Sequence, residues 1–179
     1  MKSFKYKNIE YKLKSNWNDI TLGDYYELKK DKSLIHVFNI LTGIPKKEIR
    51  NMSPLISEKI MKEIDFFWNQ DIPDGEIYLE IDNQKYVCDF DEMQFGQWID
   101  IEDFQSKGIE KNMHNIIAIL IKPITVDYSD YDWKGMAEKV KNHSIVNINK
   151  ILDFFLYIQK ISSATLLKYT DKKKPSLIQ

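Results

Sequence analysis

Several residue types on which catalytic and DNA-binding sites depend are scarce in this chain of 179 residues. Cys88 is the only cysteine, so the chain can form neither an intrachain disulfide nor a metal site with two thiolate ligands. Arg50 is the only arginine, although the planar guanidinium is the group that best reads guanine edges and binds phosphates with two hydrogen bonds. The composition therefore argues against a DNA-reading role.

Net charge and long apolar runs are also missing. The 26 basic and 27 acidic side chains give a formal charge of -1, so no net field would gather a polyanion or an acidic membrane surface. No segment approaches the roughly 18 uninterrupted apolar residues of a membrane span, and the first residues lack the apolar core of a signal peptide. We expect a protein made in the cytoplasm that contacts no membrane and makes no direct contact with nucleic acid.

Metal, cofactor and catalytic chemistry has little support in the residue pattern. Three histidines are too few for most metal sites. The acidic clusters around Asp89, Asp100 and Asp127 lack the ligand spacing and the central glycine of a calcium loop, so solvated carboxylates are the simpler interpretation. We expect no cofactor, no metal and no enzyme activity.

The chain does contain enough apolar surface to fold, with 43% hydrophobic residues that include nine Phe, ten Tyr and four Trp. Apolar and polar residues alternate on either side of Lys7-Asn8 and again on either side of Asp82-Asn83, which predicts two β-hairpins. The second return strand is expected to place Cys88 on its apolar side as an inert thiol. Helical periodicity follows each hairpin.

This order of elements indicates an internal repeat. The stretch DITLGDY at residues 19–25 aligns with EMQFGQW at residues 92–98, and the triplet DFF occurs at residues 65–67 and 153–155. Identities are few, so chance similarity between amphipathic helices is the alternative. If the repeat is real, Gly23 and Tyr25 correspond to Gly96 and Trp98 as scaffold residues at two helix starts, where each glycine permits close packing.

The predicted fold class is therefore α+β and helix-rich, built from two tandem hairpin-plus-helices units of ββααα type. The units span residues 1–72 and 73–168, separated by the breaker cluster DIPDG, and a basic tail covers residues 169–179. The second unit should have a longer loop near Gly108 and a longer final helix at residues 145–168.

Two groups of residues fit the repeat least well and form the candidate partner interface: Tyr128, Tyr131 and Trp133, and Lys172, Lys173 and Lys174. Tyr and Trp combine a large contact area with a polar tip, so those that the core does not use are natural interface anchors. Three lysines give only a weak, salt-sensitive attraction, and a solvated terminus is the alternative for them.

The segments ITLGDYYEL…LIHVFNILTGIPKKEI and MQFGQWIDIEDF…MHNIIAILIKP resemble a pattern found in small bacteriophage proteins from head-to-tail and tail gene regions. They are similar to small virion proteins of crAss-like phages and, more loosely, to phage tail assembly chaperones, over roughly residues 20–124. The resemblance implies a virion protein that contacts portal, tail or ring components and copies of itself in a symmetric ring. The alternatives are a non-virion tail assembly chaperone and, from another class, a metal-dependent or nucleic-acid-binding phage factor.

Overall fold

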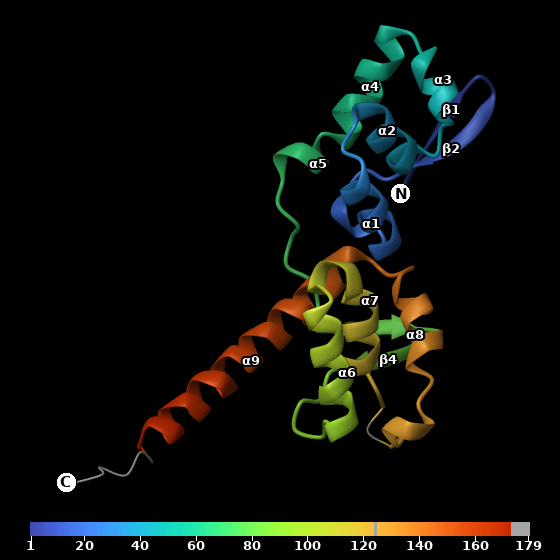
Figure 1. Cartoon of the computed structure of the whole chain (residues 1–179). Helices are drawn as coiled ribbons and strands as arrows, with labels where there is room; N and C mark the ends of the chain where they lie inside the picture. The colour runs from blue at the N-terminus through green and yellow to red at the C-terminus, as the bar shows by residue number, and fades with distance from the viewer. Residues whose placement is uncertain (124, 173–179) are drawn as a thin grey trace.

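The computed structural model describes residues 1–123 and 125–172, and it divides into two successive hairpin-plus-helices units (Figure 1). The first unit opens with an antiparallel hairpin and continues in short helices. Its elements are β1 (Lys2–Tyr6), β2 (Ile9–Leu13), the 3-10 helix η1 (Trp17–Asp19), α1 (Leu22–Lys30), α2 (Leu34–Thr42), α3 (Lys46–Arg50), α4 (Pro54–Ile64) and α5 (Phe66–Asn69).

The second unit repeats the order of hairpin and then helices, with one long last helix in the place of α4 and α5 and with its 3-10 helix later in the unit. Its elements are β3 (Tyr78–Ile81), β4 (Gln84–Val87), α6 (Phe95–Ser106), α7 (Ile109–Leu120), the 3-10 helix η2 (Tyr128–Asp130), α8 (Trp133–Val140) and α9 (Ile145–Lys172). Figure 1 shows the units one above the other, with α1 beside α7 at the junction and α9 leaving the junction at an angle. The predicted α+β class is confirmed.

Both hairpins form for the local reason that the sequence indicated. Lys7 and Asn8 have φ values of 49° and 65°, and Asp82 and Asn83 have values of 53° and 62°. Two successive left-handed residues make the turn whose twist matches that of the flanking strands. Each hairpin is a separate two-stranded sheet, and β4 ends at Val87, one residue before the cysteine that was expected within it.

Matching caps begin the first long helix of each unit. In α1, Thr21 Oγ1 accepts the Asp24 N–H at 3.1 Å, and Asp24 Oδ2 accepts the Thr21 N–H at 2.9 Å. In α6, the Gln94 N–H likewise donates to Gln97 Oε1 at 2.9 Å, whereas the Gln97 N–H donates to the Gln94 backbone carbonyl at 3.0 Å. A glycine is the second residue of both helices, as the repeat predicted.

An aromatic triad also recurs in both units. The Trp17 ring lies 5.5 Å from Phe66 and 5.7 Å from Phe67. The residue aligned with it, Phe90, lies 5.4 Å from Phe154 and 6.0 Å from Phe155. Because the DFF triplets lie in α5 and α9 respectively, these contacts tie the start of each unit to its end.

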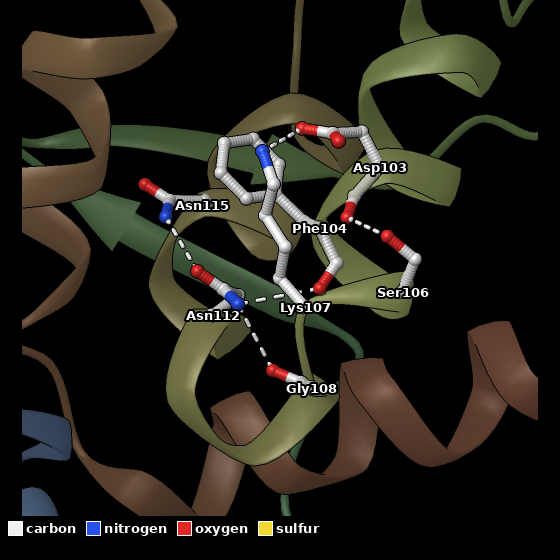
Figure 2. Close-up of polar contacts among 7 residues, drawn as sticks. All are labelled: Asp103, Phe104, Ser106, Lys107, Gly108, Asn112 and Asn115. Carbon is white, nitrogen blue, oxygen red and sulfur yellow. Dashed lines mark hydrogen bonds and ion pairs between the residues drawn. The ribbon is translucent and has the colours of Figure 1, made fainter.

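The turn between the first two helices is closed in the same way in both units. In the second unit, Asn112 Nδ2 donates to the carbonyls of Phe104 at 3.2 Å and Gly108 at 3.0 Å (Figure 2). In the first unit, His36 Nε2 donates to the Glu27 carbonyl at 3.0 Å. In each case a side chain from the second helix satisfies a carbonyl that the first helix leaves unpaired.

The units differ in length at places that the sequence only partly predicted. The prediction of a longer loop near Gly108 is wrong. Residues 107–108 join α6 to α7, whereas residues 31–33 join α1 to α2. The additional chain instead lies between α7 and α8. Helix α7 ends at Leu120, and Pro123 prevents it from continuing. The final helix is longer, as predicted, and extends to Lys172, past the expected end at residue 168.

Buried apolar side chains from both units form one contiguous core. It contains Ile20 and Leu41 from the first unit and Ile101, Ile116 and Phe155 from the second, all fully buried. The two units therefore share a core and do not fold as separate globules. In the described residues, no helix combines the length and the apolar character that crossing a bilayer requires.

Candidate functional site

The junction between the units is the contact that organises the molecule. Its first component is the start of α1, which packs on the linker at residues 141–144 that joins α8 to α9. Three backbone hydrogen bonds of 2.9 Å cross it: from Leu22 N to His143 O, from Gly23 N to Lys141 O, and from Ile145 N to Ile20 O. The linker carbonyls thereby satisfy two of the N–H groups that the first turn of a helix leaves without internal partners.

The scaffold role predicted for Gly23 has a geometric cause. A Cβ atom on Gly23 would lie 3.3 Å from the Lys141 carbonyl oxygen, which is tighter than ordinary contact. The neighbouring side chains of Ile20 and Leu22 are 0% exposed at this junction. Tyr25 is half-buried, and Lys29 Nζ lies 5.3 Å from the centre of its ring. Because Gly23 has no side chain, the backbone of α1 can contact the backbone of the linker, and the apolar neighbours exclude water from this contact.

The second component of the junction is a polar pair between α1 and α7. Tyr26 Oη accepts the His114 backbone N–H at 3.2 Å and lies 2.9 Å from His114 Nδ1. Burial, with the positive charge of Lys141 as a smaller cause, lowers the pKa of His114 to about 4. The imidazole is therefore neutral at pH 7, and its Nδ1 shares a hydrogen bond with the tyrosine hydroxyl.

A cavity of about 670 Å³ lies beside this pair, between α1 and α7. Lysines and glutamates line most of it, and Lys29 Nζ lies 3.8 Å from Glu110 Oε1. Both of those side chains are well exposed, so their attraction is weak. In the described residues, no group of three or more His, Cys, Asp or Glu side chains could hold a metal ion.

The start of α6 occupies the position in the second unit that the start of α1 occupies in the first. Its cap is covered, because Tyr128 N donates to Gln94 Oε1 at 2.8 Å and Gln94 Nε2 donates to Asp127 Oδ1 at 3.2 Å, but its apolar side chains are open. Phe95, aligned with Leu22, is 81% exposed, and Ile99 is 51% exposed. Neither the Phe95 N–H nor the Gly96 N–H donates to an acceptor within the described residues. We name Phe95 and Ile99 the open α6 face. Sequence reasoning missed it, although the alignment of Phe95 with Leu22 was available.

The other scaffold residues of the second unit pack inward. A Cβ atom on Gly96 would lie 3.0 Å from Cδ1 of Tyr128, so close packing requires this glycine too. Trp98 is half-buried, with its ring 6.2 Å from that of Phe155. Gly96 and Trp98 thus repeat the roles of Gly23 and Tyr25 within their own unit.

The aromatic residues of the predicted partner interface are engaged inside the chain. Tyr128 Oη donates to Asp100 Oδ2 at 2.5 Å, and Tyr131 Oη donates to the Ala118 carbonyl at 3.0 Å. The Trp133 ring packs edge-on against Phe104 at 5.5 Å. Burial is the main cause that raises the pKa of both tyrosines well above the ordinary value of 10, so each hydroxyl keeps its proton.

These contacts hold the segment between α7 and α8 against α6 and α7. All three rings are half-buried, so only their remaining exposed surface is available to a partner, and that contact stays a prediction. Of the predicted basic residues, Lys172 is the last residue of α9, whereas Lys173 and Lys174 lie outside the described residues.

The remaining candidates from the sequence have structural roles. Burial raises the pKa of the Cys88 thiol to about 12, which makes it an unreactive side chain. The Asp89 carboxylate accepts the Asp91 N–H at 3.1 Å within a turn, and Asp100 accepts the Tyr128 hydroxyl. These carboxylates therefore shape local backbone and anchor an aromatic side chain.

Comparison of the chain with protein-family models, with curated proteins and with solved structures gives no match in any of the three.

Proposed function

We propose that this chain is a non-catalytic bacteriophage structural protein, a component of the virion head-to-tail connector or tail that acts through protein contacts in a symmetric ring. The observation that supports the assembly role is the open α6 face, where Phe95 and Ile99 are 81% and 51% exposed. Exposed aromatic and aliphatic side chains beside unpaired backbone donors are typical of a surface that a partner covers. The bacteriophage setting comes from the motif resemblance over residues 20–124.

The last helix adds a second surface for contacts. Helix α9 packs on α1, α7, η1 and β3 near its start, and Figure 1 shows its later part extending away from both units. Tyr157 on α9 is 61% exposed, although Gln159, two residues further along, still bonds to Gln105 of α6 at 3.1 Å. A helix that leaves the body of a subunit in this way can lie across a neighbour in a ring.

The decisive experiment is quantitative mass spectrometry of density-purified particles of the source bacteriophage. A connector or tail component should be present in a fixed ratio to the portal protein. A chain that is abundant in infected cells but absent from particles would overturn the virion role.

A tail assembly chaperone is the second candidate, because the same open apolar surface could hold an aggregation-prone tail component until assembly. Affinity purification from infected cells separates the two roles. A chaperone should co-purify with one tail protein before particles form, whereas a connector component should co-purify with assembled portal or tail complexes. Strong binding to DNA that falls steeply with salt would instead favour a nucleic-acid-binding factor.

A further inference from the structure

The contact between the two units has two sides, and each side has an open counterpart elsewhere in the molecule. One side is the start of α1, whose counterpart is the open α6 face. The other side is the linker between α8 and α9, whose counterpart is the linker at residues 51–53 between α3 and α4. Because the units repeat, a junction of the same kind could form between two copies of the chain.

The helix side of the junction corresponds residue by residue. Leu22 and Tyr26 on α1 contact the second unit, and they align with Phe95 and Ile99 on α6. Leu22 is 0% exposed, and Tyr26 bonds to His114 across the junction, whereas Phe95 is 81% exposed and Ile99 51%. Equivalent apolar positions are thus covered in one unit and uncovered in the other.

The linker side corresponds in backbone conformation. In the linker after α8, Asn142 N donates to Lys139 O and His143 N donates to Val140 O, both at 3.0 Å. The linker after α3 shows the same pattern, since Asn51 N donates to Glu48 O at 3.1 Å and Met52 N donates to Ile49 O at 3.2 Å. Two turns with the same hydrogen bonds present their carbonyls in the same way.

The apolar residues next to the two linkers again differ in exposure. Val146, two residues after Ser144, is 3% exposed at the junction. Leu55, two residues after Ser53, is 66% exposed, and Ile56 beside it is 37% exposed. We name Met52, Leu55 and Ile56 the open linker face. Figure 1 shows α3 and α4 at the end of the first unit that points away from the second unit, so one chain cannot close this contact on itself.

We infer that the chain self-associates head to tail, with the open α6 face of one copy docked on the open linker face of the next. In this arrangement the Phe95 N–H donates to the Met52 carbonyl, as the Leu22 N–H donates to the His143 carbonyl. The bond from Gly23 to Lys141 is not repeated, because the Tyr128 ring lies on the side of Gly96 that the Lys141 carbonyl takes on Gly23. The inference deepens the proposed assembly function, because it names the partner as a second copy and gives the residues of the contact.

A second bond of the internal junction also has no counterpart between copies. Ile145 N donates to Ile20 O inside the chain, but the residue that corresponds to Ile145 is Pro54, which has no N–H. The contact between copies therefore has one of the three backbone bonds and should be weaker and more easily reversed than the internal junction. Because its two surfaces differ, it generates a closed ring or an open filament and not an isolated dimer.

Two charge variants test this contact with the full chain. Phe95→Asp replaces the main apolar side chain of the open α6 face with a carboxylate, and Leu55→Asp does the same in the open linker face. Both residues lie in the first turn of a helix, where a carboxylate is favourable, so neither variant should unfold the chain. Ile9→Asp on β2, where Ile9 is 55% exposed, is the matched control for charge at an exposed apolar site.

Sedimentation velocity over a range of concentrations gives the readout, with circular dichroism as the check on folding. The wild-type chain and Ile9→Asp should form species larger than a dimer, and each test variant alone should associate at least about tenfold more weakly, because burial of an unpaired carboxylate is unfavourable. An equimolar mixture of the two test variants should give a heterodimer that grows no further, since each supplies the face that the other lacks.

Three results would overturn the inference: a monomeric wild-type chain at all concentrations, unchanged association of either test variant, or no heterodimer in the mixture. A monomeric chain that mass spectrometry nevertheless finds in particles would leave the proposed function standing, with other virion proteins as its partners.

Discussion

The opposite environments of Leu22 and Phe95 give the sharpest prediction about stability. The two residues hold the same position in the repeat, the first residue of α1 and of α6, but are 0% and 81% exposed. Truncation of each to alanine should therefore have very different effects on the free energy of unfolding.

Leu22→Ala removes a fully buried side chain from the junction and leaves a cavity lined by both units. Such substitutions cost about 2–5 kcal/mol, and we expect about 3 kcal/mol here. Phe95 has only about a fifth of its surface covered, which corresponds to roughly 40 Å² and about 1 kcal/mol. The better helix propensity of alanine offsets about 0.5 kcal/mol of this loss. Phe95→Ala should therefore lower the free energy of unfolding by about 0.5 kcal/mol or less.

Urea unfolding at a protein concentration at which the chain is monomeric measures both values. With an m-value of about 2–3 kcal/mol/M, Leu22→Ala should lower the midpoint by roughly 1 M and Phe95→Ala by no more than about 0.3 M. Tryptophan fluorescence and circular dichroism should report the same transition. Equal costs for the two variants, or a cost below about 1 kcal/mol for Leu22→Ala, would refute the assignment of the junction.

Two further predictions concern titrating groups. Burial lowers the pKa of His114 from 6.5 to about 4, so its contribution to stability is full above pH 6.5 and is lost as the pH falls through 4. In the His114→Gln variant, the urea midpoint should therefore fall less between pH 6.5 and pH 4 than it does in the wild-type chain. A smaller fall should remain, because burial also lowers the pKa of His143. An unchanged dependence of the midpoint on pH would contradict the role of Tyr26 and His114. Because burial raises the pKa of Cys88 to about 12, iodoacetamide at about pH 8 should alkylate the native thiol on the order of a hundredfold more slowly than the unfolded one, and equal rates would place Cys88 in solvent.

Local features of the fold could be predicted from the sequence because they depend on a few neighbouring residues. Residues such as Asn8 and Asn83 tolerate positive φ, so both hairpin turns could be predicted from the sequence. Thr21 and Asp24, which hydrogen-bond to each other, are only three residues apart, so the start of α1 could be predicted too. The order of elements in each unit follows from a series of such local signals.

The repeat could be read from the sequence for the same reason, but its exceptions could not. The position of the extra chain between α7 and α8 depends on what the segment packs against, and Tyr128 and Tyr131 reach across to Asp100 and Ala118. Those partners lie far along the chain, so their pairing leaves no local signal. The same tertiary contacts engage part of each predicted interface anchor within the second unit.

By itself, the sequence determined two similar hairpin-plus-helices units, because caps, turns and periodicity act over a few residues. Only the tertiary structure decided which copy of each surface is covered. Leu22 and Phe95 begin equivalent helices, yet Leu22 is buried because the linker after α8 packs on it, and within the described residues no segment packs in the same way on Phe95. Burial depends on which other segments of the chain pack on a surface, and in the described residues no third unit packs on α6 as the second unit packs on α1.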